Sequence, residues 1–235
     1  YEQDFKLMGG LLYSGNDKYS KADIASKMDE LKASVSINTN SLGEISVGIK
    51  GVKENIDATV DFVVEMLSTP TFAPSEIDID RKAMITNKES NRNEPSSVAS
   101  DSLNKSINGH KKGHPLAYRT IDEQIADLNK VTQKRLKKVY RAHMTIENAH
   151  IGVVGDVDAS AFSASLEKKL SNLVNGEQYE KMSSNYKDVE GVDNWIETPD
   201  KANSMLFIGH RVELNKQHPD YHAATTANYI FGGSG

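Results

Sequence analysis

The chain has 235 residues, of which 37% are hydrophobic and 26% are charged, a composition typical of a folded globular protein rather than a disordered one. The formal net charge of -5 and a pI near 5.8 argue against nucleic acid as a partner. No apolar run approaches the roughly 20 residues that a membrane span needs. Cysteine is absent, which excludes disulfides and thiolate metal sites.

Both ends of the sequence interrupt a pattern. The chain begins with "YEQDF", without an initiator Met or a signal peptide, and a helical apolar pattern is already running at Phe5. It stops within the Gly-rich stretch "NYIFGGSG", which is typical of a turn. We therefore expect a piece of a longer protein, so the missing targeting signals carry no information about location.

The first fifty residues predict two helices and a hairpin. Helical spacing predicts a helix over residues 4–14, which ends before a turn with the sequence "GNDK". A second helix is expected to begin at Ser20, whose hydroxyl can cap it together with Asp23 three residues later. Residues 34–41 and 44–52 alternate apolar and polar side chains, which predicts two antiparallel strands with one buried face.

The middle of the chain predicts a run of helices separated by breakers. One helix should end at Pro70, and a long one should begin at Ser75 and be interrupted at Pro95. Two more are expected after Thr120 and Thr132, because Thr is a suitable N-cap. The apolar residues of the long helix are its core candidates: Ile77, Ile79, Met84 and Ile85.

The C-terminal third predicts a return to mixed structure. We expect a buried strand at 148–157, an amphipathic helix at 158–174, two strands within 195–212 and a helix over 218–231. Helices and hairpins that come in blocks favour an α+β fold, with an antiparallel sheet and helices packed on one face.

The order of these elements and their short motifs resembles one peptidase family. The motifs are "GNDKYSKADI", "VEMLSTPTFAPSEID", "GHPLAYRTIDEQIADL", "VYRAHM" and "AHIGVVGDVD". In this order they resemble the pitrilysin/insulinase family of zinc peptidases, which includes the mitochondrial processing peptidases. The resemblance implies a domain over residues 1–175 whose N-terminal strands are missing, a linker at 176–190, and the truncated beginning of a second, similar domain at 191–235.

In that family the first helix carries the motif H-x-x-E-H, with two zinc-binding His and a Glu that is the general base. Aligned on the following turn, the motif falls on Lys6, Gly9 and Gly10, and the distal ligand falls on Asn87, or on Glu89 after a register slip. An ammonium has no lone pair and glycine has no side chain, whereas catalytic zinc needs three protein ligands. We therefore expect neither catalytic residues nor a metal in this segment.

Two histidine pairs and two groups of glycines are further candidates for a functional role. His218 and His222, and His110 and His114, are each four residues apart, but neither pair has an evident third ligand, so ordinary solvated or capping roles are favoured. The two adjacent glycines of the first helix either let a neighbouring backbone approach or reflect drift or a break between helices. By resemblance, a further group is expected to touch substrate: Gly232, Gly233 and Gly235.

An intact domain pattern with a stripped metal site implies, by resemblance, the non-catalytic half of a zinc peptidase. Such a half forms the chamber wall and the peptide-holding surface opposite a zinc-bearing half, on the same chain or on a separate subunit. Zinc is expected only in the partner half, peptide or unfolded protein as substrate, and no activity from this segment alone. The alternative is a non-enzymatic assembly or binding subunit on the same fold. The location is unknown from the sequence; the resemblance is compatible with the bacterial periplasm and, as the alternative, with the mitochondrial matrix.

Overall fold

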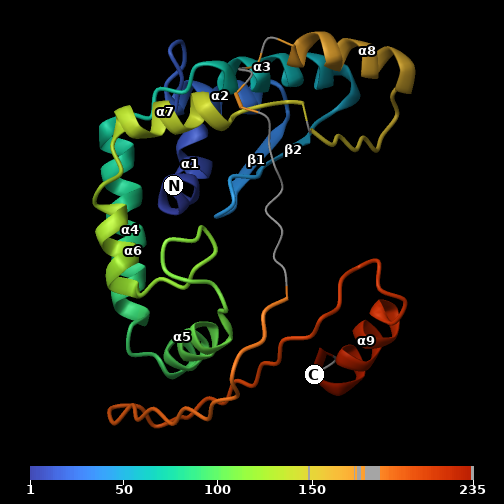
Figure 1. The fold of residues 1–235 in the computed structure, drawn as a ribbon. Helices are drawn as coiled ribbons and strands as arrows, with labels where there is room; N and C mark the ends of the chain where they lie inside the picture. Colours follow the sequence, from blue (N-terminus) through green and yellow to red (C-terminus); the bar gives the residue numbers. More distant parts are fainter. Residues whose placement is uncertain (148, 172, 174–175, 178–185, 234–235) are drawn as a thin grey trace. The chain divides into compact units, whose positions relative to one another are not determined.

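The structure is a computed structural model that describes residues 1–147, 149–171, 173, 176–177 and 186–233 (Figure 1). The chain divides into two compact units. The first comprises Tyr1–Glu89 and Thr120–Lys181, and the second comprises Ser90–Arg119 and Met182–Gly235. Each unit is therefore built from two separate stretches of the sequence. Within the described residues, no helix is both long and apolar enough to cross a bilayer.

The first two helices lie close to their predicted ranges, and the second begins at its predicted cap. Helix α1 spans Glu2–Leu12 and helix α2 spans Lys21–Glu30. The Ser20 hydroxyl accepts from the Asp23 amide while the Asp23 carboxylate accepts from the Ser20 amide, which is the predicted capping box. The predicted N-terminus of α2 is confirmed.

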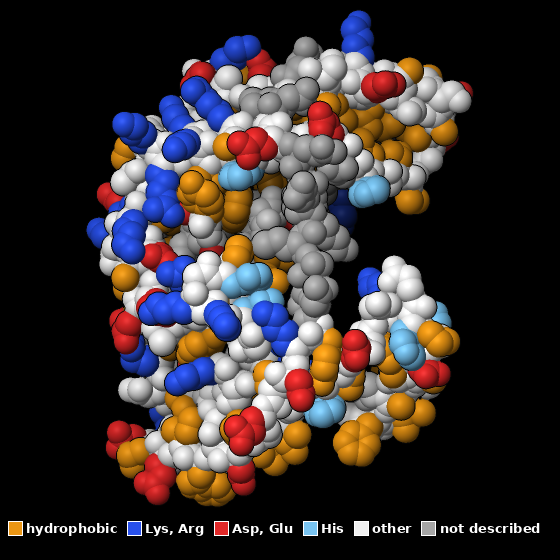
Figure 2. Space-filling view, viewed as in Figure 1, with side chains coloured by type: hydrophobic (Ala, Val, Ile, Leu, Met, Phe, Trp, Pro, Cys, Tyr) orange, Lys and Arg blue, Asp and Glu red, His pale blue; other side chains and the backbone are white. Residues whose placement is uncertain are grey.

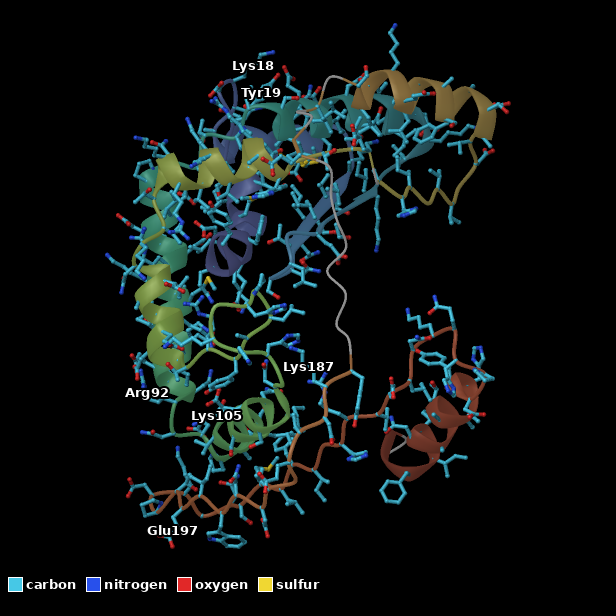
Figure 3. All side chains as sticks on the ribbon, in the orientation of Figure 1. Lys18, Tyr19, Arg92, Lys105, Lys187 and Glu197 are labelled. Carbon is cyan, nitrogen blue, oxygen red and sulfur yellow. The ribbon has the colours of Figure 1, made fainter. Side chains whose placement is uncertain are left out.

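A single side chain organises the turn between α1 and α2. The carboxamide oxygen of Asn16 accepts from the amides of Lys18 and Tyr19, both labelled in Figure 3, at 2.9 and 2.8 Å. The carboxamide nitrogen of Asn16 donates to the Glu65 carbonyl at 3.0 Å. The "GNDK" turn is thus tied to a helix that lies almost fifty residues further along the chain.

The predicted hairpin is confirmed. Strand β1 (Ser34–Thr39) pairs with strand β2 (Ile45–Lys50) in an antiparallel ladder that joins Ser34 to Lys50 and Thr39 to Ile45. Burial alternates along β1, because every second side chain turns toward the helices. Helices α1 and α2 both pack against β1. The described residues therefore form an α+β fold, as predicted.

The remaining helices are separated by the predicted breakers. Pro70 follows one helix directly, and Pro95 occupies the first turn of another, where its missing N–H costs nothing. Thr120 and Thr132 both cap helices with their hydroxyls. The elements are η1 (Lys53–Asn55), α3 (Ile56–Ser68), α4 (Pro74–Asn91), α5 (Pro95–Ile107), α6 (Ile121–Leu128), α7 (Gln133–His143), α8 (Ala159–Leu170), α9 (Tyr221–Asn228) and the π-helical turn η2 (Tyr229–Gly233).

The hydrophobic core of the first unit lies between α1, α2, α3, α4 and α7. Among the core candidates of the long helix, Ile77 is buried, and Met84 and Ile85 are partly buried against the core. Ile79 is 58% exposed, so its assignment to the core was wrong. It lies two residues after Ile77, and this spacing places it on a different face of the helix. The largest fully buried side chains are Leu7, Met8, Leu11, Leu12, Ile24, Met66, Phe72, Ile77, Leu128 and Leu136.

The strands predicted in the C-terminal third were wrong. Residues 149–157 of the expected buried strand carry no strand pairing, and Val154 is fully exposed. Residues 195–212 are likewise extended without a ladder, and Trp195 is 91% exposed. The physical reason is that, among the described residues, no neighbouring strand offers backbone groups to these segments. Alternating apolar residues make these segments suitable for a β-strand, but among the described residues they have no strand to pair with.

Within the second unit, extended chain is attached to α5 by polar contacts. The Asn194 carboxamide donates to the hydroxyls of Ser102 and Ser106 at 3.1 and 3.0 Å. The guanidinium of Arg211 donates to the Ile107 carbonyl at 2.8 Å. Side-chain hydrogen bonds therefore take the place of a sheet ladder in joining these residues.

Candidate functional site

The residues aligned with the zinc motif's two His and its Glu lie on α1, and of these only Gly9 is buried. Lys6 is half-buried, and its ammonium donates to the Glu2 carboxylate at 2.6 Å, one helical turn away. This ion pair fixes a positive charge at the position of the first metal ligand. A cation held there repels a metal ion, so the residues at this position do not fit zinc.

Gly9 stands at the position of the general base, and a neighbouring strand fills the space beside it. The Thr39 hydroxyl at the end of β1 accepts from the Gly9 amide at 3.2 Å and donates to the Phe5 carbonyl, one turn earlier on α1. A Cβ on Gly9 would lie 2.9 Å from Thr39 Oγ1 and 3.2 Å from Thr39 N. Of the two interpretations of the glycine pair, the structure favours close approach of a backbone for Gly9. A glutamate here would require β1 to move.

Gly10 differs from Gly9 because it is exposed and faces a side chain rather than a backbone. Its Cβ would lie 3.2 Å from Asp80 Oδ2 on α4. Burial raises the pKa of Asp80, the nearby Glu76 raises it further, and Lys21 opposes both. The contact places α1 beside α4, the helix that carries the distal position.

The distal position is occupied by an amide, and a lysine lies next to it in the sequence. Asn87 and Glu89 are exposed on α4, and the adjacent Lys88 is partly buried and donates to Gln124 Oε1 of α6 at 2.6 Å. Burial lowers the pKa of Lys88, and the positive charge of Lys6 lowers it further. Two lysines, Lys6 on α1 and Lys88 on α4, are thus close enough for their charges to interact. Within the described residues, no group of three or more His, Asp or Glu is placed to hold a metal ion.

The other residues weighed as sites are dispersed. Gly232 lies in the turn η2 with open space around it, Gly233 ends that turn, and Gly235 lies outside the described residues. His218 accepts from the Asp220 amide at 3.2 Å. That bond gives it a local role at the beginning of α9.

The rings of His110 and His114 stack at a centroid distance of 4.2 Å. Partial burial lowers the pKa of His110, and the positive charges of His114, Lys187 (labelled in Figure 3) and Arg211 add to the effect. A face-to-face ring pair surrounded by cations is a poor metal chelator, because a metal needs two ring nitrogens converging on one point.

Sequence reasoning missed the ion pair that anchors α1. Asp4 is fully buried, and both its carboxylate oxygens accept from the Arg135 guanidinium of α7 at 2.7 and 2.8 Å. The guanidinium also lies 5.5 Å from the centroid of the Tyr1 ring. Next to Asp4, the Gln3 carboxamide is buried without a hydrogen-bond partner. Because Asp4 and Arg135 are 131 residues apart, no local sequence pattern indicates that they form an ion pair.

Comparison with known proteins agrees with this geometry. Residues 130–235 match the family model of the peptidase M16 inactive domain. Residues 130–235 are therefore similar in sequence to an M16 inactive domain. The resemblance to the pitrilysin-type peptidases and to their non-catalytic half is thereby confirmed. Among curated proteins, no sequence match is found.

Solved structures show the same fold. A peptidase M16 inactive domain from Pseudomonas fluorescens superposes with a TM-score of 0.76 at 20% identity, over 97% of this chain and 54% of that one. The periplasmic protease PqqL from Escherichia coli has a TM-score of 0.59 at 16% identity, over 80% and 21%. The ferredoxin protease FusC, solved in complex with Arabidopsis ferredoxin, has a TM-score of 0.56 at 16% identity, over 77% and 19%. The chain thus spans about half the length of the Pseudomonas domain.

Proposed function

We propose that this chain is a non-catalytic half of an M16 zinc peptidase, which encloses polypeptide opposite a zinc-bearing half. The observation that carries the proposal is that Gly9 stands in place of the glutamate that is the general base. The M16 inactive-domain fold is kept, while the position of the general base is filled by Thr39 of β1. Lys6 and Gly10 stand where the two zinc-binding His would be needed, so this chain keeps the fold without the zinc ligands.

The proposed role follows from what such a half can supply. It positions an extended peptide and excludes water from the zinc-bearing half, and it makes or breaks no bond itself. Zinc belongs to the partner half in this proposal, on the same chain or on a separate subunit. The similarity to FusC, which was solved in complex with ferredoxin, supports a polypeptide substrate. The similarity to the periplasmic protease PqqL supports a periplasmic location.

The test is a mixing experiment. The zinc-bearing half is assayed with and without this chain on an unfolded peptide of about 20 residues, with an unrelated globular protein of similar size as control. We expect kcat/KM to rise only with this chain, and no cleavage from this chain with zinc alone. If the zinc-bearing half alone reaches the same kcat/KM, the chamber-wall role is wrong. Stable association without any change in kcat/KM would instead identify an assembly subunit, the second candidate function.

A further inference from the structure

Helix α7 has one buried apolar face and one cationic face. One face is buried through Leu136, Val139 and Tyr140, and the Tyr140 hydroxyl donates to the Leu67 carbonyl. The opposite face carries four cationic side chains at helical spacings of three, four and seven: Lys134, Lys137, Lys138 and Arg141. We call these four residues the basic face of α7. Lys and Arg side chains gather over this part of the surface in Figure 2.

The basic face disfavours the helix that carries it. Lys134 and Lys138, and likewise Lys137 and Arg141, are like charges four residues apart, a spacing at which they repel on the helix surface. Lys134 also lies in the first turn, which holds no acidic residue, and a cation there opposes the helix dipole. Folding alone therefore gives no reason for this arrangement.

The basic face also differs from many other cationic positions of the first unit, because it gathers four cations, without a carboxylate partner among the described residues, on one face of a single helix. Many lysines of the first unit lie within 3.2 Å of a carboxylate: Lys6, Lys18, Lys21, Lys27, Lys53, Lys130 and Lys169. By contrast, no carboxylate of the described residues forms an ion pair with the four cations of the basic face. The charges face outward and are available to a second molecule.

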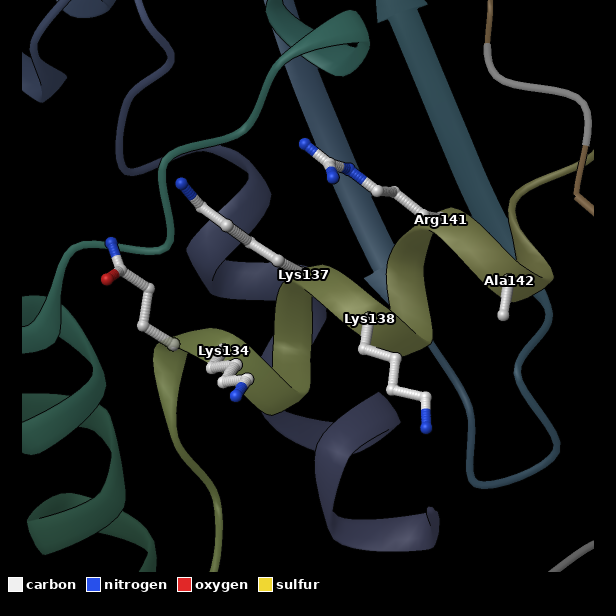
Figure 4. A pocket seen from close by; sticks show the side chains of 6 residues that line it. Lys134, Lys137, Lys138, Arg141 and Ala142 are labelled. Atoms are coloured by element: carbon white, nitrogen blue, oxygen red, sulfur yellow. The ribbon is translucent and has the colours of Figure 1, made fainter.

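A surface depression lies along the basic face. It has a volume of 660 Å³ and is lined by Gln133, Ala142 and the four cations. In Figure 4, Lys137 and Arg141 extend to one side of α7, and Lys134 and Lys138 extend to the other. The cations thus flank a shallow trough instead of converging on a point, which suits an elongated anion more than a small ion.

We propose that the basic face of α7 docks an acidic segment of a polypeptide. From Lys134 to Arg141 the helix rises about 10 Å, the length of about three extended residues, so a run of three or four carboxylates matches the four cations. A lining without aromatic rings cannot stack nucleobases, and the net charge of -5 repels long polyanions. Ala142, the apolar residue of the lining, is too small to anchor in a bilayer. The inference does not depend on the chamber-wall proposal.

The experiment measures binding of the whole chain to a labelled peptide with four consecutive glutamates, by fluorescence anisotropy. The test variant replaces Lys134, Lys137, Lys138 and Arg141 with Gln. The matched control replaces four exposed lysines elsewhere, Lys32, Lys50, Lys82 and Lys168, with Gln, so that both variants lose four charges. A peptide with four glutamines controls for contacts that do not involve charge.

We expect the parent chain and the control variant to bind the glutamate peptide alike, and the test variant to bind it roughly tenfold or more weakly, as several exposed ion pairs together would give. Binding should weaken toward about 0.15 M salt, where the Debye length is about 8 Å. The melting temperature of the test variant should be unchanged or higher, because repulsion within α7 is relieved.

Three results would overturn the proposal. The first is equal loss of binding in both variants. The second is a lower melting temperature of the test variant, which would mean that the charges are engaged within the fold. The third is binding of a single-stranded oligonucleotide or of anionic lipid vesicles through the basic face at least as tightly as the peptide, which would assign the face to another class of partner.

Discussion

The helical N-terminal region and the extended residues 186–220 contain similar kinds of apolar side chain but treat them in opposite ways. Leu11 of α1 is fully buried, whereas Leu206 and Ile208 are more than 80% exposed. A helix satisfies its own backbone and needs only one packed face, while an extended segment needs a neighbour for its backbone as well as for its side chains. The difference shows that apolar patterning produces a core only when the backbone is satisfied at the same time.

The largest expected effect comes from equal truncations in the two regions. Leu11→Ala should lower the free energy of unfolding by about 2–5 kcal/mol, because it leaves a cavity between packed helices. Leu206→Ala should change it by no more than about 0.5 kcal/mol, because the side chain contacts mostly solvent. Chemical denaturation followed by circular dichroism measures both. If Leu206→Ala lowers the free energy of unfolding nearly as much as Leu11→Ala does, residues 186–220 are packed in solution. The two regions would then not differ in how they treat apolar side chains.

A smaller effect should separate the two adjacent glycines of α1. Alanine in a helix is ordinarily about 0.5–1 kcal/mol better than glycine, and Gly10→Ala should gain part of this because only the Asp80 carboxylate has to move. Gly9→Ala should instead destabilise by about 1 kcal/mol, because overpacking against the Thr39 backbone outweighs the gain. Thermal unfolding of the two variants side by side gives the comparison. Equal stabilisation by both would mean that β1 does not pack closely on α1.

The smallest effect concerns His110 in the second unit. Its pKa is lowered from 6.5, so the folded state favours the neutral ring and the unfolded state binds more protons below about pH 6.5. Stability conferred by this residue is present at neutral pH and is lost as the pH falls through that region. Lys187→Gln should raise the pKa of His110, because one of the nearby positive charges is removed.

An NMR titration of the His110 ring protons measures this shift. The control is Lys201→Gln, which removes a lysine of the same unit that is paired with Glu94 at 2.6 Å. A pKa of His110 that stays the same after Lys187→Gln would show that the two residues are not neighbours in solution.

Local sequence signals predicted the helices well, because the decisive chemistry lies within a few residues. Ser20, Thr120 and Thr132 cap helices with their own side chains, and Pro95 begins one. The strand at 148–157 was mispredicted because pairing depends on a second segment that its own residues cannot specify. Strand prediction was correct only for the hairpin, where the two partners are joined by a short turn.

The candidate site was predictable in composition but not in its contacts. The alignment placed Lys6, Gly9 and Asn87 on two helices, and the structure places α1 beside α4 through Gly10 and Asp80. That Thr39 fills the space next to Gly9 could not be predicted, because it depends on how the hairpin lies on α1. The basic face of α7 is visible in the sequence as "QKRLKKVYR", but the lack of carboxylate partners among the described residues can be seen only in the structure.

The Asp4–Arg135 ion pair has a consequence for the time course of synthesis. The two residues are 131 positions apart, and a ribosome adds about 5–20 residues per second. Roughly 7–26 s therefore pass between the synthesis of the buried carboxylate and that of the guanidinium that neutralises it. During this interval α1 cannot dock without burying an unpaired charge, so its apolar face remains open to chaperones. Helix α1 is made before α7 and completed late, and slow translation of residues 90–119 would lengthen its exposure.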